Sequence, residues 1–297
     1  MFQFLVIGII QGAVIGLVAI GIVMVYKGSR VFNFAQAEFG TVGGYMLYVG
    51  LEVLNIPYMG AILFALLAVA FMGFLTERIV VRPLMNAPRV TLLVATAGVA
   101  LLAIALELII GGQEIRQVAP IRQGNAVSGF LGAYISWQQF ISLLVLAGLA
   151  VGLAYFFNKT DRGLAVLATS QESVATELVG ISTKNMSTFV WVFAAVLGGI
   201  AGVLQAPDST FQPGFMTSQG NYLLLGFAAA VLGGITSLAG AFIGGQLIGI
   251  ISNLGAYFYS RFIVELVEIE GFPQLLVFLL LLTVLLVRPK GLLGSEA

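Results

Sequence analysis

Histidine and cysteine are both missing from this chain of 297 residues, and only 9% of its residues are charged. Without cysteine the chain forms no disulfide bond and performs no thiol chemistry. Without histidine it lacks the side chain that most readily relays protons or binds transition metals near neutral pH. The sequence also lacks a Gly-x-x-x-x-Gly-Lys-Ser/Thr phosphate-binding loop and a dinucleotide fingerprint. We therefore predict no catalytic residue, no metal site and no cofactor in this chain.

What the chain does have is apolar sequence. Hydrophobic residues make up 60% of it, and the mean hydropathy is +1.06. A helix needs about 20 apolar residues to cross a hydrocarbon core about 30 Å thick, and several uncharged runs meet that length. The formal net charge is zero, so nothing indicates nucleic-acid binding. We predict an all-α, polytopic transmembrane helical bundle of about 8–10 spans, folded as a single transmembrane domain over residues 1–297.

A nine-span arrangement fits the apolar runs. The expected spans are residues 4–26, 39–54, 59–76, 90–110, 140–157, 189–206, 223–235, 239–258 and 272–287. Residues 223–240 form either parts of two spans or one re-entrant hairpin followed by a span, and the sequence favours neither. In the first span Gly8, Gly12 and Gly16 recur every four residues, which predicts a smooth face for close contact with a neighbouring helix.

The basic residues indicate an orientation. With the amino terminus outside, Arg116, Arg122 and Arg261 lie on the outer side, which leaves ten of the 13 Lys and Arg residues inside. Basic residues tend to stay in the cytoplasm. We therefore expect residues 159–188 and the carboxyl terminus to be cytoplasmic.

The 159–188 segment is the charged and polar interruption of the apolar chain. It reads as two short helices joined by a turn. The spacing of Thr169 and Glu172 is typical of a capping box that starts the second helix, and Gly180 is placed to end that helix. An amphipathic pair of helices of this kind suits docking onto another protein.

Ionisable and polar residues near the membrane are few. Asn33, Gln36 and Glu38 cluster where the first two spans meet and are candidates for the gate or the solute pathway. Glu38 is either a gate contact or a charge at a helix N-terminus. We interpret Glu52 and Glu107, which lie near span ends, as carboxylates that reach the aqueous boundary.

A run of paired glycines surrounds a Thr-Ser turn at residues 231–245. Glycine permits a sharp reversal and close packing, and hydroxyls can bond the freed backbone groups. We interpret the run as structural packing, with Thr236 and Ser237 as candidates for the gate or the solute pathway.

Five segments together resemble the permease subunits of branched-chain amino acid ABC importers, in particular the shorter, LivH-type permease. They span nearly the whole chain in the family's order and are residues 31–38, 77–84, 160–181, 231–245 and 288–294. Gln36-Ala37 is a departure, because relatives more often carry His-Gly there, so no role of that histidine transfers to this chain.

The resemblance implies a permease of a bacterial or archaeal inner membrane that pairs with a second, related permease. Two cytoplasmic ATPase subunits, which hold ATP and Mg²⁺, and an external solute-binding protein would complete the importer. The 159–188 segment would then couple the permease to an ATPase, through Asp161, Arg162, Glu172, Glu177 and Gly180. The mechanism implied is alternating access, with selectivity residing mostly in the binding protein.

Other functions remain open at this point. Similar permeases carry urea, short amides or other small amino-acid-like solutes. A self-sufficient secondary transporter or channel needs an intramembrane ion site, for which the Glu38 cluster is the candidate. A structural membrane scaffold would have no ATPase partner.

Overall fold

The computed structural model describes residues 1–130, 133–210, 212–219, 221–263 and 271–294, and most of these residues are helical. The helices are α1 (Phe2–Ser29), α2 (Gln36–Tyr48), α3 (Tyr58–Leu75), α4 (Arg89–Gly111), α5 (Trp137–Lys159), α6 (Asp161–Gln171), α7 (Ser173–Leu178), α8 (Thr183–Gln205), α9 (Tyr222–Gly233), α10 (Leu238–Phe258) and α11 (Phe272–Val287). One antiparallel hairpin, β1 (Asn125–Phe130) and β2 (Ala133–Ser136), precedes α5, with Val127 opposite Ile135.

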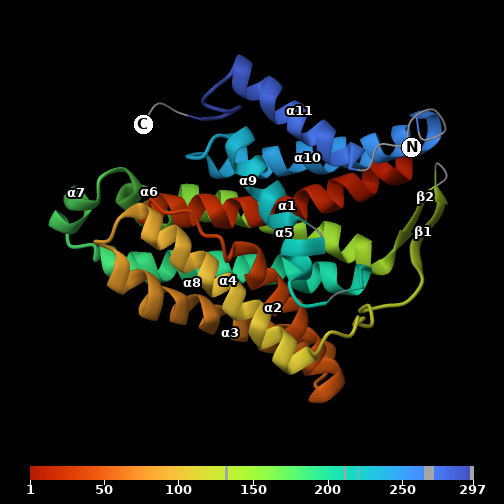
Figure 1. Cartoon of the computed structure of the whole chain (residues 1–297), viewed down its shortest axis with the longest axis horizontal. Coiled ribbons are helices and arrows are strands. Elements are labelled where there is room, and N and C mark those ends of the chain that lie inside the picture. The colour runs from red at the N-terminus through yellow and green to blue at the C-terminus, as the bar shows by residue number, and fades with distance from the viewer. Residues whose placement is uncertain (131–132, 211, 220, 264–270, 295–297) are drawn as a thin grey trace.

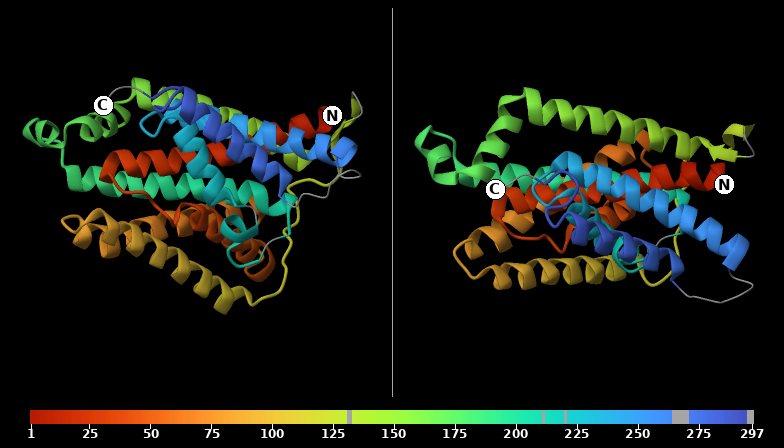
Figure 2. Two further views of the ribbon diagram at one scale, coloured as in Figure 1. Left: turned by 45° about the horizontal axis from the view of Figure 1, so that its top comes forward. Right: turned by 90° about the horizontal axis from the view of Figure 1, so that it is seen from above.

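The long helices run side by side, with α6 and α7 at one end of the bundle and the β1–β2 hairpin and the amino terminus at the other (Figures 1 and 2). Among the described residues, six helices are long and apolar enough to cross a membrane, and α9 and α11 are shorter apolar helices. The prediction of a polytopic helical bundle is therefore confirmed. The bounds of α11 coincide with the expected last span.

Helix α1 lies at the centre of the bundle and packs against α10, α8 and α9. The predicted glycine face of α1 meets α10. A Cβ atom built on Gly249 would lie 2.3 Å from the Gly12 Cα, and one built on Gly245 would lie 2.5 Å from the Gly16 Cα. Two backbones therefore touch directly, which confirms the close approach that the four-residue glycine spacing predicts.

The chain that follows α8 does not cross the membrane as one continuous helix. A 3₁₀ turn at Ala206–Asp208 ends α8, and a π-helical turn at Phe215–Gln219 lies inside the protein, where Phe215 and Met216 are buried. Helix α9 then begins at Tyr222, also buried. Its 12 residues span about 18 Å, too little to cross a membrane alone. The irregular region that we placed at 223–240 thus begins earlier, at the end of α8.

Two expected boundaries are wrong. Residues 77–84 form no loop, because a π-helical turn (Thr76–Val81) and a 3₁₀ turn (Arg82–Leu84) continue α3. The polar segment 159–188 ends early as well, because α8 begins at Thr183. In both places helix continues through charged residues that the hydropathy pattern assigns to loops. In the extension of α3, the Glu77 and Arg82 charges bond to each other, as described below.

The α1–α10 contact predicts a strong effect of added volume. Changing Gly249→Val should destabilise the protein by about 1–3 kcal/mol or more, because overpacking forces the two backbones apart. Thermal unfolding in detergent, followed by size-exclusion chromatography, measures the effect. Gly148→Val in α5 is the matched control, since a Cβ atom there meets nothing within 4 Å. Equal stability of the two variants would contradict the packing described here.

Candidate functional site

The end of the bundle that carries α6 and α7 holds the first candidate site. Thr160 caps α6, because its hydroxyl accepts a hydrogen bond from the Gly163 amide at 3.1 Å. Asp161 and Arg162 follow in the first turn and are exposed, and Glu172 is exposed between α6 and α7. The predicted pair of short helices is therefore confirmed.

The predicted capping box is wrong. The Thr169 hydroxyl donates to the Ala165 carbonyl oxygen at 2.8 Å within α6, and the Glu172 side chain makes no cap for α7. The reason is that Thr160, nine residues earlier, already starts the helix, so Thr169 falls inside it.

The predicted helix end at Gly180 is confirmed. Gly180 has φ of 88°, and its amide donates to the Glu177 carbonyl oxygen at 2.9 Å, while the Ile181 amide donates to the Thr176 carbonyl oxygen at 3.2 Å. This pair of bonds is the Schellman motif, which favours glycine in the left-handed residue. Gly180 therefore fixes the direction in which the chain leaves α7 toward α8.

The tip of α7 exposes two large apolar side chains. Leu178 is 84% exposed and Val179 is 76% exposed, beside polar α6–α7 residues. An exposed apolar patch rimmed by polar residues is typical of a protein contact surface. We did not single out these residues from the sequence, where a Leu-Val pair looks like ordinary helix packing. The exposed residues of α6 and α7 are called the α6–α7 surface below.

A hydrogen-bonded network joins this surface to the membrane-spanning helices. The Glu177 carboxylate accepts a bond from the Thr183 hydroxyl in the first turn of α8. Arg82 donates to the carbonyl oxygen of the next residue, Lys184, at 3.1 Å and to the Thr188 hydroxyl, one turn further along α8, at 2.6 Å. Arg82 also makes two bonds with the Glu77 carboxylate, at 3.0 and 3.1 Å. The extension of α3 is thus tied to the start of α8.

Asn33 and Gln36 lie deep inside the bundle, as their polar cluster predicts, and they bond to each other at 3.2 Å. The Asn33 side-chain oxygen accepts from the Ala35 backbone amide at 3.0 Å. The side-chain amide of Gln36 donates to the Ala194 carbonyl oxygen of α8 at 2.8 Å. Both side chains therefore hold the buried start of α2 in place.

Thr236 and Ser237 lie in the turn between α9 and α10. The Ser237 hydroxyl caps α10 by accepting from the Gly240 amide at 3.0 Å, and the Thr236 carbonyl oxygen accepts from Lys27 at 2.9 Å. The chain after α11 also bonds here, since the Leu292 and Leu293 amides donate to the last carbonyl oxygens of α9, at 2.8 and 3.0 Å. These contacts fix the turn, and a pathway role of its residues stays a prediction.

Glu38 lies on α2 and is 0% exposed, away from the Asn33–Gln36 pair and beside Thr41 and Thr217. Glu107 of α4 is 3% exposed, and its carboxylate accepts a bond from the Gly214 amide at 2.9 Å. Our interpretation of Glu107 as a carboxylate at the aqueous boundary is therefore wrong, whereas Glu52 is exposed as expected. Among the described residues no group of three potential metal ligands occurs.

These features define a class of protein. The chain is a multi-pass helical membrane protein whose helices α2 and α9 begin inside the bundle, and whose α6–α7 surface projects beyond the bundle at one end (Figure 2). Helices that begin at membrane depth are typical of transport proteins, where they line a pathway.

Comparison with known proteins identifies the family. The model of the family "branched-chain amino acid transport system / permease component" matches residues 4–287, so the chain belongs to this family. The permease protein BraD of Pseudomonas aeruginosa is 29% identical over 98% of this chain and 95% of its own length. LivH of Escherichia coli K12 is 29% identical over 97% of this chain and 93% of its own.

A solved structure shares the fold. The PsaBC complex of Streptococcus pneumoniae with a Fab has a chain that superposes with a TM-score of 0.53, at 18% identity, over 98% of this chain and 94% of that chain. The similarity to permease families, which the five sequence segments indicated, is therefore confirmed at the level of family and fold.

The Arg82 network predicts that replacing Arg82 destabilises the protein much more than replacing the nearby Arg78. Arg82→Ala should lower the free energy of unfolding by about 3–5 kcal/mol, because it leaves the Glu77 carboxylate, 0% exposed, without its cation. Arg78→Ala, at an exposed position four residues earlier, should change it by no more than about 0.5 kcal/mol. Thermal unfolding of both variants in the same detergent provides the comparison. An Arg82→Ala protein as stable as the wild type would contradict the network.

Proposed function

We propose that this chain is a permease subunit of an ATP-binding-cassette importer for branched-chain amino acids in a bacterial or archaeal inner membrane. A second, related permease, two cytoplasmic ATPase subunits that hold ATP and Mg²⁺, and an external solute-binding protein complete the importer. The observation that carries the proposal is the α6–α7 surface, where Leu178 and Val179 are exposed. Such a surface is typical of a contact with another protein, and we assign an ATPase subunit as that partner.

The contacts behind the α6–α7 surface suit the transmission of movement. Glu177 ties α7 to Thr183, and Arg82 ties the next turn of α8 to the extension of α3. A displacement of α7 by a closing ATPase would therefore shift α8 and α3 together. Helix α8 packs against α1, α2 and α3, so the shift reaches the centre of the bundle.

The solute class rests on the family match and on the named relatives. BraD and LivH are named as branched-chain amino acid permeases, and each aligns with this chain over nearly its full length. Urea, short amides and other small amino-acid-like solutes are the second candidate class. A secondary transporter would work without ATP. Uptake of labelled leucine by the reconstituted importer, with and without ATP, separates these functions, because the proposal requires both leucine and ATP.

The α6–α7 surface predicts a loss of coupling when it becomes charged. Leu178→Asp should reduce leucine-stimulated ATP hydrolysis by about tenfold or more, because a carboxylate replaces an apolar anchor at the interface. The measurement uses the complete importer in proteoliposomes. Ile115→Asp is the matched control, since Ile115 is equally an exposed aliphatic residue, near the opposite end of the bundle. Unchanged stimulation in Leu178→Asp would remove the docking role from this surface.

Gly180 provides an independent prediction that rests on backbone conformation. Gly180→Val should weaken leucine-stimulated ATP hydrolysis, because valine at φ of 88° costs about 1–3 kcal/mol and redirects the chain between α7 and α8. Gly124→Val carries the same strain, at φ of 89° with nothing within 4 Å, but lies beside the β1–β2 hairpin. We expect full stimulation in Gly124→Val. A similar loss in both variants would show that strain alone, rather than its position, causes the effect.

A further inference from the structure

Two acids and two hydroxyls gather inside the bundle, and we call them the core acid cluster: Glu38 and Thr41 of α2, Glu107 of α4, and Thr217 of the π-helical turn. Gly214 and Met216 bind this cluster through their amides, which donate to Glu107 at 2.9 Å and to the Thr41 hydroxyl at 3.3 Å. Glu38 lies close enough for its charge to act on Glu107. The turn before α9 is thus held between two helices by acidic and hydroxyl side chains.

Three carboxylate oxygens of this cluster are buried without a hydrogen bond of normal geometry: both oxygens of Glu38, beside which the Thr41 and Thr217 hydroxyls lie, and Oε1 of Glu107. The salt bridges of the described chain join Arg82 to Glu77 and Arg116 to Glu114, so neither acid of the cluster has a cationic partner there. A carboxylate inside a membrane protein costs much free energy unless it is paired, and such groups mark substrate or ion pathways. Within the described chain, therefore, no ion pair neutralises either acid of the cluster.

Arg116 is a basic residue within electrostatic range of Tyr45, beside Glu107, and its guanidinium bonds other groups. It donates to the Tyr48 hydroxyl at 3.0 Å and to the Gly111 carbonyl oxygen at 2.9 Å, beyond the end of α4. The phenol of Tyr45 lies within electrostatic range of both Glu107 and Arg116. No Lys or Arg of the described chain thus neutralises Glu38.

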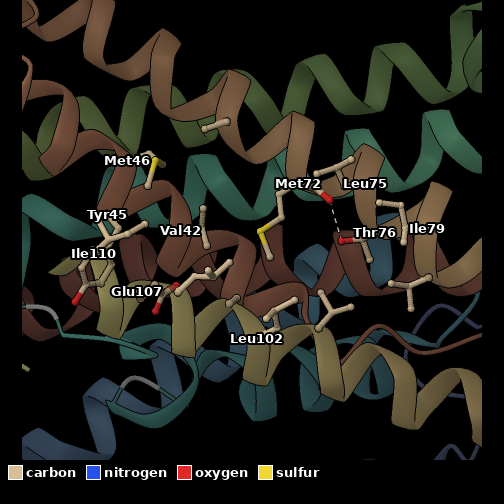
Figure 3. Close-up of a pocket in the computed structure, with 15 residues that line it drawn as sticks. Val42, Tyr45, Met46, Met72, Leu75, Thr76, Ile79, Leu102, Glu107 and Ile110 are labelled. Carbon is tan, nitrogen blue, oxygen red and sulfur yellow. Dashed lines mark hydrogen bonds between the residues drawn. The ribbon is translucent and has the colours of Figure 1, made fainter. Parts of the chain in front are cut away.

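An apolar cavity of about 410 Å³, open toward the outside of the bundle where Leu102 is 60% exposed, adjoins the cluster between α2, α3 and α4 (Figure 3). Its walls include Val42, Met72, Leu102 and Leu106, and Glu107 is its one acidic wall residue. The volume is within the roughly 300–1,000 Å³ of small-molecule sites. An apolar cavity with one carboxylate at its edge matches a molecule that has an aliphatic part and an amino group.

We propose that the core acid cluster is the subsite that receives the ammonium group of the transported solute, whose aliphatic side chain enters the adjoining cavity. The proposal rests on the proposed function for the identity of the solute. An ammonium has three N–H donors, which matches the three unpartnered oxygens of Glu38 and Glu107. The pairing is purely ionic and hydrogen-bonded, so no covalent step is involved.

The arrangement in the structure is a closed one, because Glu38 is inaccessible. Opening requires the π-helical turn at Phe215–Gln219 to move away from α2 and α4. The turn is attached to these helices by the Gly214–Glu107 and Met216–Thr41 bonds.

The test uses the complete importer and a leucine analogue with a photoreactive diazirine in its side chain. The binding protein delivers the analogue, vanadate and ATP arrest turnover, and light attaches the analogue to the nearest residues, which mass spectrometry identifies. We expect adducts on the cavity walls of α2 and α4. Glu38→Gln and Glu107→Gln should each lower adduct yield and leucine uptake by about 30-fold or more.

Two further variants separate binding from folding. Glu52→Gln removes an exposed carboxylate at the end of the α2 region and should behave as the wild type. Glu38→Asp keeps the charge and should retain most of the adduct even if Glu38→Gln is poorly folded. Adducts elsewhere in the chain, or undiminished adducts in both glutamine variants, would overturn the ammonium subsite. Glu38 and Glu107 would then be interpreted as protonated, neutral acids.

The outcome also distinguishes this inference from the proposed function. If the wild-type importer shows no leucine-stimulated ATP hydrolysis, the proposed function fails whatever the adducts show. If wild-type stimulation is present while neither glutamine variant changes adduct or uptake, the core acid cluster alone is excluded as a solute subsite.

Discussion

The direct backbone contact between α1 and α10 is the constraint on which the rest of the bundle depends. Gly12 and Gly249 leave no room for a side chain, so the two helices form a thin central pair. Because this pair is thin, α8 and α9 also reach α1, and α2 and α3 pack in turn on α8. In a membrane, packing of this kind replaces the hydrophobic effect as the force that holds helices together.

Buried polar side chains follow from the two helices that begin inside this bundle. The start of α2 and the turn before α9 leave backbone groups that lipid cannot satisfy. Asn33 bonds the backbone at the first of these places, and Thr41 and Glu107 bond it at the second. Glu38 is different, because its oxygens make no hydrogen bond of normal geometry in the described chain. The same interior thus contains polar groups that stabilise the fold and one buried acid, to which we assign the ammonium group of the solute.

Much of this was predictable from the sequence, for physical reasons. Apolar runs and glycine spacing report helix positions and close packing, so the α1 face and the bounds of α11 were predicted correctly. Hydropathy alone could not show that Arg82 and Glu77 neutralise each other within a continuing helix. Hydropathy also misplaced Glu107, because the depth of a side chain inside the bundle depends on where the neighbouring helices end. The exposure of Leu178 and Val179 is a tertiary property that no local pattern carries.

The absence of cysteine makes a direct test of the account simple, since Leu178→Cys introduces a unique thiol. A short thiol-to-amine cross-linker added to membranes that contain the complete importer would identify what lies against the tip of α7. We predict a cross-link to an ATPase subunit from Leu178→Cys and none from Ile115→Cys. Cross-linking of the ATPase to position 115 and not to position 178 would contradict the account, because it would place the energy-supplying partner at the opposite end of the bundle.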